Sequence, residues 1–231
     1  MFATFKAAQR CRGTQILASD HPGGPYEPWT DGPVTPADWE CLDGTLYVDD
    51  EGNPWIVFCH EWVQVRNGAI YAMRLAPDLK RAAGPPVFLF NASEAHWVRC
   101  LNQSDKQENA GSERPSSTFP VYVTDGPFLH KTERGALLML WSSFGTKGYA
   151  MGIARSVTGA VEGPWTHEPE PLSVEDGGHG MLFRAFDGRL LLALHQPNDT
   201  PNERAIFRDV TEQGDSIMVG EKIAEDYPDQ P

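Results

Sequence analysis

Three stretches of the chain repeat one strand–turn–strand pattern, and each begins with a polar residue capable of acid–base or ligand chemistry. The stretches are 42–62, 124–144 and 178–198. When they are aligned, Asp43, Asp125 and His179 fall into one column, and a tight turn containing glycine follows each of them. A repeated hairpin that points its first residue at a shared centre gathers distant side chains into one pocket. The repeat therefore predicts a radial arrangement of hairpins around a common site.

The repeated units have the composition of short strands. The chain's 19 Pro and 22 Gly separate short runs rich in branched and aromatic residues, which is typical of many short strands joined by turns. The second strands, WIVFC, LLMLW and LLLAL, are apolar throughout, so we expect both of their faces to be buried. A third strand and a proline-containing outer edge follow. Four-stranded units at this period are typical of β-propeller blades.

Counting these units predicts an incomplete propeller. Units led by Asp43, Asp125 and His179 are preceded by the outer half of another unit over 1–40, whereas small propellers have at least about four blades. We therefore expect residues 1–231 to form a single, partial propeller domain that lacks about one and a half blades at its N-terminus. The long interval between the first two units places an insertion at 94–119, which is polar, turn-rich and expected to be a surface loop.

Charge and hydropathy exclude several classes of partner. The formal net charge of −13 argues against nucleic acid and against an anionic membrane surface, because both require clustered Lys and Arg. No apolar run is long enough for a transmembrane helix. The start, MFATFKAAQR, lacks the apolar core of a signal peptide, which favours the cytoplasm. The same stretch has the pattern of the inside of a strand.

The four cysteines lack zinc-type spacing, so buried free thiols are expected at Cys41 and Cys59. The sequence does not indicate an oligomeric state.

Three short motifs resemble those of glycoside hydrolase family 43, whose members are five-bladed β-propellers that act on arabinofuranosides, xylosides and related sugars. The matching motifs are Leu42-Asp43 with Asp49-Asp50-Glu51-Gly52, then Asp125-Gly126-Pro127, then Gly178-His179-Gly180. The resemblance covers nearly all of 11–207. It implies an all-β, five-bladed propeller from which the first blade and part of the second are missing.

The resemblance implies a glycosidase of the α-L-arabinofuranosidase or β-xylosidase type. Such enzymes hydrolyse terminal bonds in plant-derived oligo- or polysaccharides with inversion, using two carboxyl groups on opposite faces of the bond. By similarity Asp125 is the general acid, and Asp43 modulates its pKa. A second negative charge nearby would raise the pKa of the acid and keep it protonated near neutrality. No cofactor is required.

The chain departs from the family pattern at two catalytic positions. The family acid is usually Glu, so Asp125 is one methylene shorter, and Glu61 becomes an alternative acid. The family base lies in the first blade, which this chain is expected to lack. The acidic residues that precede Asp43 lie in Pro/Gly-rich edge segments and are poor candidates: Asp20, Asp31 and Asp38. Hydrolysis is therefore expected to be impaired, and two alternatives stay open: a non-catalytic carbohydrate-binding propeller, and a scaffold that presents a protein-binding face.

Side chains at the ends of the second strands are predicted to bind the sugar, because antiparallel neighbours return to the face where the leading strands start. Aromatic faces stack on sugar C–H surfaces, and amides or hydroxyls bind sugar hydroxyls. The predicted substrate-binding residues are His60, Trp62, Trp141, Ser142, His195, Gln196 and Arg204. Trp141 could instead pack between blades, and Arg204 could be a solvated surface residue. By resemblance, His179 lies on the central axis beside a possible structural calcium, although it could also be a hydrogen-bonded core histidine.

Overall fold

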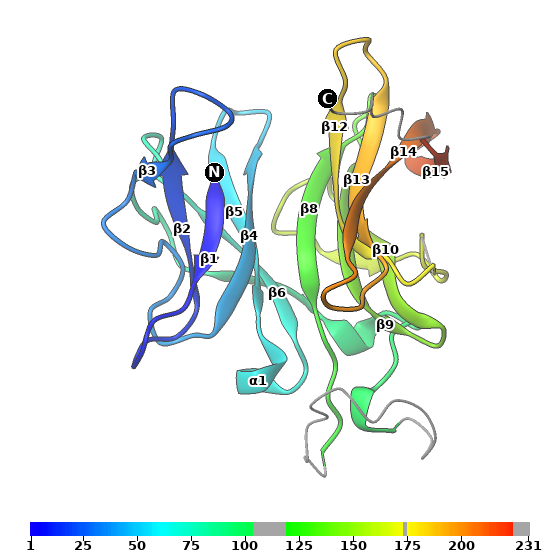
Figure 1. Cartoon of the computed structure of the whole chain (residues 1–231), viewed down its shortest axis with the longest axis horizontal. Helices are drawn as coiled ribbons and strands as arrows, with labels where there is room; N and C mark the ends of the chain where they lie inside the picture. Colours follow the sequence, from blue (N-terminus) through cyan, green and yellow to red (C-terminus); the bar gives the residue numbers. More distant parts are fainter. Residues whose placement is uncertain (104–118, 173–174, 224–231) are drawn as a thin grey trace, which may run out of the picture.

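The described part of the chain is built almost entirely from antiparallel sheets. A computed structural model describes residues 1–103, 119–172 and 175–223, and these residues form three four-stranded sheets and one three-stranded sheet (Figure 1). The described helical segments are α1 (Trp62–Val65) and the short turns η1 (Ala92–Glu94) and η2 (Leu101–Gln103). The prediction of an all-β chain is confirmed.

In each sheet the strands follow one another in chain order. The first sheet contains β1 (Phe2–Phe5), β2 (Gly13–Ala18) and β3 (Glu27–Pro28). The second contains β4 (Cys41–Val48), β5 (Pro54–His60), β6 (Ala69–Arg74) and β7 (Val87–Asn91). The third contains β8 (Asp125–Lys131), β9 (Leu137–Gly145), β10 (Gly148–Ser156) and β11 (Trp165–His167). The fourth contains β12 (Gly178–Arg184), β13 (Leu190–Gln196), β14 (Arg204–Gln213) and β15 (Ser216–Lys222).

The sheets are arranged as propeller blades. Strand β4 contacts β1 on one side and β8 on the other, and β8 in turn contacts β12. Figure 1 shows β4 and β8 facing each other at the centre, with the first two sheets on one side and the last two on the other. The propeller prediction is therefore confirmed, with four blades among the described residues. The five-blade count stays a prediction.

The first sheet matches the outer strands of the third sheet. Strand β3 comes directly after Gly24-Pro25-Tyr26, and β11 begins at the Trp of the similar Gly163-Pro164-Trp165. This alignment pairs β1, β2 and β3 with β9, β10 and β11. Among the described residues, the first sheet thus has no strand equivalent to β4, β8 or β12. The interpretation of 1–40 as the outer half of a unit stays a prediction.

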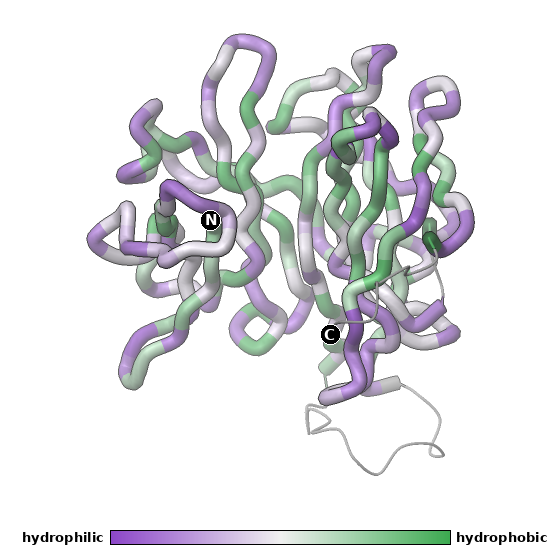
Figure 2. Tube along the Cα trace, turned by 45° about the horizontal axis from the view of Figure 1, so that its top comes forward, coloured by the Kyte–Doolittle hydropathy of each residue, from purple (hydrophilic) through white to green (hydrophobic). Residues whose placement is uncertain are grey.

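The second strand of each complete sheet carries the core. All residues of β5 are buried, and in β9 successive residues contribute to two different clusters. Leu137 and Met139 pack with β5 and β6 residues, whereas Leu138 and Leu140 pack with residues of the fourth sheet. Successive side chains point to opposite faces of a strand, so the apolar runs reflect burial between two neighbouring sheets, as predicted. In Figure 2 the hydrophobic stretches follow the strands and the hydrophilic ones follow many of the connections.

The predicted insertion at 94–119 lies mostly outside the described residues. Its described beginning is not a surface loop, because Ala95, Trp97 and Cys100 are buried. The Trp97 ring lies against Gly152, where an added Cβ would come within 2.5 Å of the indole. The four cysteines are free, and Cys41 and Cys59 are buried as predicted. No helix in the described residues has the length and apolarity needed to span a membrane.

Candidate active site

Each of the three leading strands, β4, β8 and β12, begins with an irregularity in its pairing. The register shifts lie between Leu42 and Thr45, between Asp125 and Phe128, and between Gly178 and Met181. At these points Asp43, Gly126 and His179 adopt left-handed backbone conformations, with φ of 56°, 50° and 55°. Bulges of this kind bend a strand and redirect a side chain. Each of the three leading strands therefore begins with the same kind of β-bulge.

The alignment of the bulges corrects the predicted column by one residue. The structural equivalent of Asp43 and His179 is Gly126, and Asp125 precedes it. The sequence carried a sign of this offset, because the turn glycine Gly135 follows Asp125 one residue later than the corresponding glycines follow the other two. A side chain at position 126 would also clash, since a Cβ there would lie 2.8 Å from the ring of His179. Glycine is thus required for the close approach of β8 and β12.

The backbone amides at the three bulges are each bound by a side chain of the preceding sheet. The amide of Asp43 donates to Oγ1 of Thr4 at 3.0 Å. The amide of Gly126 donates to Oδ2 of Asp43 at 3.1 Å, and that of His179 donates to Oγ of Ser142 at 2.8 Å. These bonds fix the relative positions of the sheets where the candidate catalytic side chains meet.

Asp125 and Asp43 lie together, as the radial repeat predicts. The Asp43 carboxylate accepts the amide next to Asp125, and its Oδ2 lies 3.8 Å from Nδ1 of His179. Burial raises the pKa of Asp125 well above its usual range, and the charge of Asp43 raises it further. A hydrogen bond of 3.1 Å from the Tyr149 hydroxyl to Oδ2 of Asp125 opposes these effects. Burial and the neighbouring Asp43 charge thus favour the protonated form of Asp125, which is the form that a general acid requires.

Glu61, the alternative acid, belongs to the same cluster. It is 7% exposed and immediately precedes α1. Its Oε2 forms an ion pair with Nη1 of Arg12. Burial raises the pKa of Glu61, and the guanidinium of Arg12 opposes that rise. The charge of Glu61 in turn contributes to the raised pKa of Asp125, so the two carboxyl groups are electrostatically linked.

The three acidic residues considered as bases lie away from this cluster. Asp20, Asp31 and Asp38 are exposed in connections that flank β3 or precede β4. None of the three contacts Asp43, Asp125 or Glu61 in the hydrogen bonds of the described residues. Their placement agrees with the prediction that they are poor candidates.

Two predicted sugar-binding residues, His195 and Arg204, line a cavity together with His179, whose Nδ1 lies 3.8 Å from Oδ2 of Asp43. The cavity has a volume of about 320 Å³, and its lining residues come from β12, β13, β14 and the residue just before β14. Its lining residues are His179, Met181, Ala193, Leu194, His195, Glu203, Arg204 and Ala205. An apolar floor with a few convergent polar groups is the usual composition of a small-molecule site. His195 and Arg204 thus line one cavity, and their role in sugar binding stays a prediction.

Other predicted sugar-binding residues are placed inside the fold. Trp141 is fully buried and packs against Phe90, Trp97 and His167, which leaves no face for a sugar. His60 is buried and stacks on Trp39 at 4.3 Å. The structure thus favours the packing alternative for Trp141.

The other three predicted sugar-binding residues, Ser142, Trp62 and Gln196, do not line the cavity described above. Ser142 is fully buried and binds the His179 amide, so it positions a site residue. Trp62 is partly exposed at the start of α1. Gln196 is partly exposed and donates its side-chain amide to the carbonyl of Glu175.

Sequence reasoning missed Tyr149, which contacts the candidate acid. Tyr149 is 2% exposed, and its ring stacks on that of His195 with a centroid distance of 5.5 Å. Its amide donates to Oδ1 of Asp176 at 3.2 Å. The predicted site residues lie at the starts of the leading strands and the ends of the second strands, whereas Tyr149 is the second residue of a third strand, β10. The antiparallel register of β9 and β10 returns this position to the site.

The residues around His179 do not form a direct calcium site. Calcium prefers about six to eight oxygen ligands, whereas His179 offers an imidazole beside one oxygen of Asp43. Among the residues with described positions, no group of three or more His, Cys, Asp or Glu side chains could hold a metal ion. The donor set here does not fit direct calcium binding.

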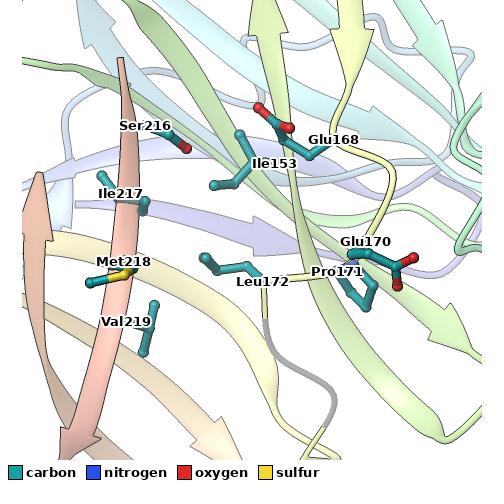
Figure 3. A pocket seen from close by; sticks show the side chains of 9 residues that line it. All are labelled: Ile153, Glu168, Glu170, Pro171, Leu172, Ser216, Ile217, Met218 and Val219. Atoms are coloured by element: carbon teal, nitrogen blue, oxygen red, sulfur yellow. The ribbon is translucent and has the colours of Figure 1, made fainter. Parts of the chain in front are cut away.

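A second cavity of about 300 Å³ lies away from the carboxylate pair (Figure 3). It is bounded by β15 on one side and by the segment after β11 on the other. Its lining residues are Ile153, Glu168, Glu170, Pro171, Leu172, Ser216, Ile217, Met218 and Val219. This cavity contains none of the predicted site residues.

Comparison with known proteins identifies a family. The family described as Glycosyl hydrolases family 43 matches residues 1–214. No curated protein matches the chain.

Several solved structures share the fold. An endo-arabinase from Bacteroides thetaiotaomicron is 44% identical with a TM-score of 0.81, and the match covers 92% of this chain and 70% of that one. A thermostable family-43 glycoside hydrolase is 18% identical with a TM-score of 0.75, over 100% of this chain and 72% of that one. An α-L-arabinofuranosidase from Lactobacillus brevis is 20% identical with a TM-score of 0.63, and the match covers 91% of this chain and 65% of that one. The last two likenesses show the fold alone.

Proposed function

This chain belongs to glycosyl hydrolases family 43, and from that premise we propose that it acts on glycosidic bonds of pentose-containing polysaccharides with Asp125 as the general acid. The observation that carries the proposal is the pairing of Asp125 with Asp43. A buried carboxyl group whose pKa is raised by a neighbouring carboxylate is suited to hold a proton and release it to a leaving group.

The proposed chemistry is displacement at the anomeric carbon. The protonated carboxyl of Asp125 gives its proton to the glycosidic oxygen as the bond from that oxygen to the anomeric carbon breaks. A water molecule on the opposite face attacks the carbon and loses its proton to a base, which inverts the configuration. The three acidic residues considered as bases, Asp20, Asp31 and Asp38, lie away from the site. We therefore expect slow hydrolysis by the 231-residue chain.

Arabinose is the sugar that we propose first. The structure with 44% identity is described as an endo-arabinase. The cavity lined by His195 and Arg204 also includes His179, whose Nδ1 lies 3.8 Å from Oδ2 of Asp43. The proposed bonds are arabinofuranosyl or xylosyl bonds. Terminal cleavage was the expectation from the sequence, and the endo-arabinase likeness adds internal arabinan bonds as a second possibility to test.

A carbohydrate-binding propeller without hydrolysis is the second candidate. It is favoured by the absence of a base among the three candidate residues and by the shorter acid. Both candidates require the same cavity, so binding and turnover have to be measured separately.

The test compares arabinan and xylan oligosaccharides in calorimetric binding and in product analysis. Sodium azide is added in parallel, because a small anion can attack the anomeric carbon without a base and form a glycosyl azide. We expect arabinan oligosaccharides to bind, slow hydrolysis without azide, and faster release of glycosyl azide with it. Product lengths distinguish terminal from internal cleavage. Binding without either product would favour the non-catalytic candidate, and no binding of either sugar would contradict both.

A further inference from the structure

The buried Glu61 carboxylate is held by one side chain from the first sheet. Arg12 lies in the connection just before β2, and its Nη1 forms an ion pair with Oε2 of Glu61. The Arg12 side chain is 32% exposed, whereas that of Glu61 is 9% exposed. A largely buried carboxylate needs a charged partner to stay ionised. Arg12 supplies that partner across the boundary between the first two sheets.

The main chain of Arg12 is itself fixed to the segment that leads into β4. Its amide donates to Oε2 of Glu40 at 2.9 Å, and its carbonyl accepts the amide of Cys41 at 3.1 Å. Its Nε lies 3.9 Å from the same Glu40 oxygen. The amide of Glu61 donates to the carbonyl of Glu40 at 2.8 Å. Arg12, Glu40 and Glu61 therefore form one network with little freedom for the guanidinium to move.

The charged groups around Glu61 come from two connections and two strands. Arg12 precedes β2, Glu40 precedes β4, and Asp43 lies in β4. Asp125, in β8, is affected by the Glu61 charge. Lys6 binds Glu40 at 3.1 Å and completes the network without touching Glu61. Arg12 is the cation of this set that is bound to Glu61 itself.

We propose that Arg12 is a positioning residue of the candidate active site, which keeps Glu61 ionised and aimed beside the Asp43–Asp125 pair. The consequence is a division of roles between the two candidate acids: Glu61 supplies a fixed negative charge and Asp125 carries the proton. The effect on catalysis rests on the proposed function, whereas the effect on the Glu61 carboxylate does not.

The physical basis of the proposal is a balance between burial and ion pairing. Burial raises the pKa of Glu61, and the guanidinium holds that pKa below the value that burial alone would impose. Removing the guanidinium should raise the pKa of Glu61 further. The loss of its charge near neutral pH should then lower the pKa of Asp125, because Glu61 is one of the groups that raises it.

The test follows the side-chain carboxyl signals of ¹³C-labelled Glu and Asp by NMR across pH, with the Glu61 signal assigned from its absence in Glu61→Gln. We expect Arg12→Gln to raise the pKa of Glu61 and lower that of Asp125, with Arg12→Lys giving a smaller shift. Lys6→Gln is the matched control, because it removes a cation from the network without breaking the Glu61 pair. This titration needs no turnover, so it is independent of whether the chain hydrolyses sugars.

If Arg12→Gln folds poorly, a double-mutant cycle of unfolding free energies tests the proposal instead. If the unpaired Glu61 charge is the cause, the double variant Arg12→Gln with Glu61→Gln should be at least as stable as Arg12→Gln alone in urea unfolding. Equal titration of Glu61 in wild type and Arg12→Gln, or an equal shift in Lys6→Gln, would overturn the proposal. Additive losses of stability in the double variant would overturn it as well.

Discussion

Asp125→Asn should lower the azide-supported cleavage of arabinan oligosaccharides by about 100- to 10,000-fold, the usual contribution of a general acid. Asparagine fills nearly the same space but has no proton to give to the leaving oxygen. In the wild-type chain, the rate should fall as pH rises through the raised pKa of Asp125, because only the protonated form donates. Product release over a pH series, measured by chromatography, checks both expectations.

The leaving group provides an internal control for this prediction. A nitrophenolate leaves without protonation, so Asp125→Asn should reduce cleavage of nitrophenyl arabinofuranoside much less. Asp31→Asn, at an exposed position between β3 and β4, should leave both rates unchanged. Near wild-type cleavage of the oligosaccharide by Asp125→Asn, together with its loss in Glu61→Gln, would contradict the assignment and identify Glu61 as the acid.

Trp141→Ala should lower the free energy of unfolding by about 3–5 kcal/mol, as is typical when a buried aromatic side chain is truncated. The indole is fully buried, with the Phe90 ring centroid at 5.3 Å and that of Trp97 at 5.0 Å. Such a loss is a large share of the stability of an ordinary domain, which is about 5–15 kcal/mol. Urea unfolding followed by circular dichroism measures it.

Trp141→Phe is the matched control, because it keeps an aromatic ring in the same cluster and should cost less. Binding of arabinan oligosaccharides, measured below the unfolding transition, should be unchanged in Trp141→Phe. A stable Trp141→Ala protein that no longer binds the sugar would instead support the sugar-binding role predicted from the sequence.

Much of the architecture could be predicted because it depends on patterns that sequence records directly. Hairpin turns require glycine at particular positions, and strands buried on both faces are apolar throughout. Both signals recur in each unit, so their repetition indicated blades and a shared centre. That repetition predicted the proximity of Asp43 and Asp125, although Asp125 lies one residue before the position equivalent to Asp43.

The remaining features depend on backbone geometry and on contacts between sheets. Asp125 was aligned with Asp43 because both are acidic residues at the start of a strand, although the shared bulge position shows that Gly126 is the equivalent of Asp43. Side chains at the ends of the second strands were all expected to face the site. In a twisted, bulged sheet, however, His60 and Trp141 point into the spaces between blades.

Partners that reach the site from other strands and connections were also missed. Arg12 and Thr4 come from the first sheet and Tyr149 from a third strand, positions without a repeated polar signature. Burial of the beginning of 94–119 was also not visible in composition, because most of that stretch is polar and turn-rich.

The central claim is that a carboxylate from one blade controls the protonation of a carboxyl group from the next. NMR titration of ¹³C-labelled aspartate measures this directly in the wild-type chain and in Asp43→Asn, with the Asp125 signal assigned from its absence in Asp125→Asn. We predict a pKa for Asp125 well above the ordinary aspartate value in the wild type and a lower one in Asp43→Asn, because a neighbouring negative charge has been removed. An Asp125 that titrates like a solvated aspartate, or that is indifferent to position 43, would contradict the account.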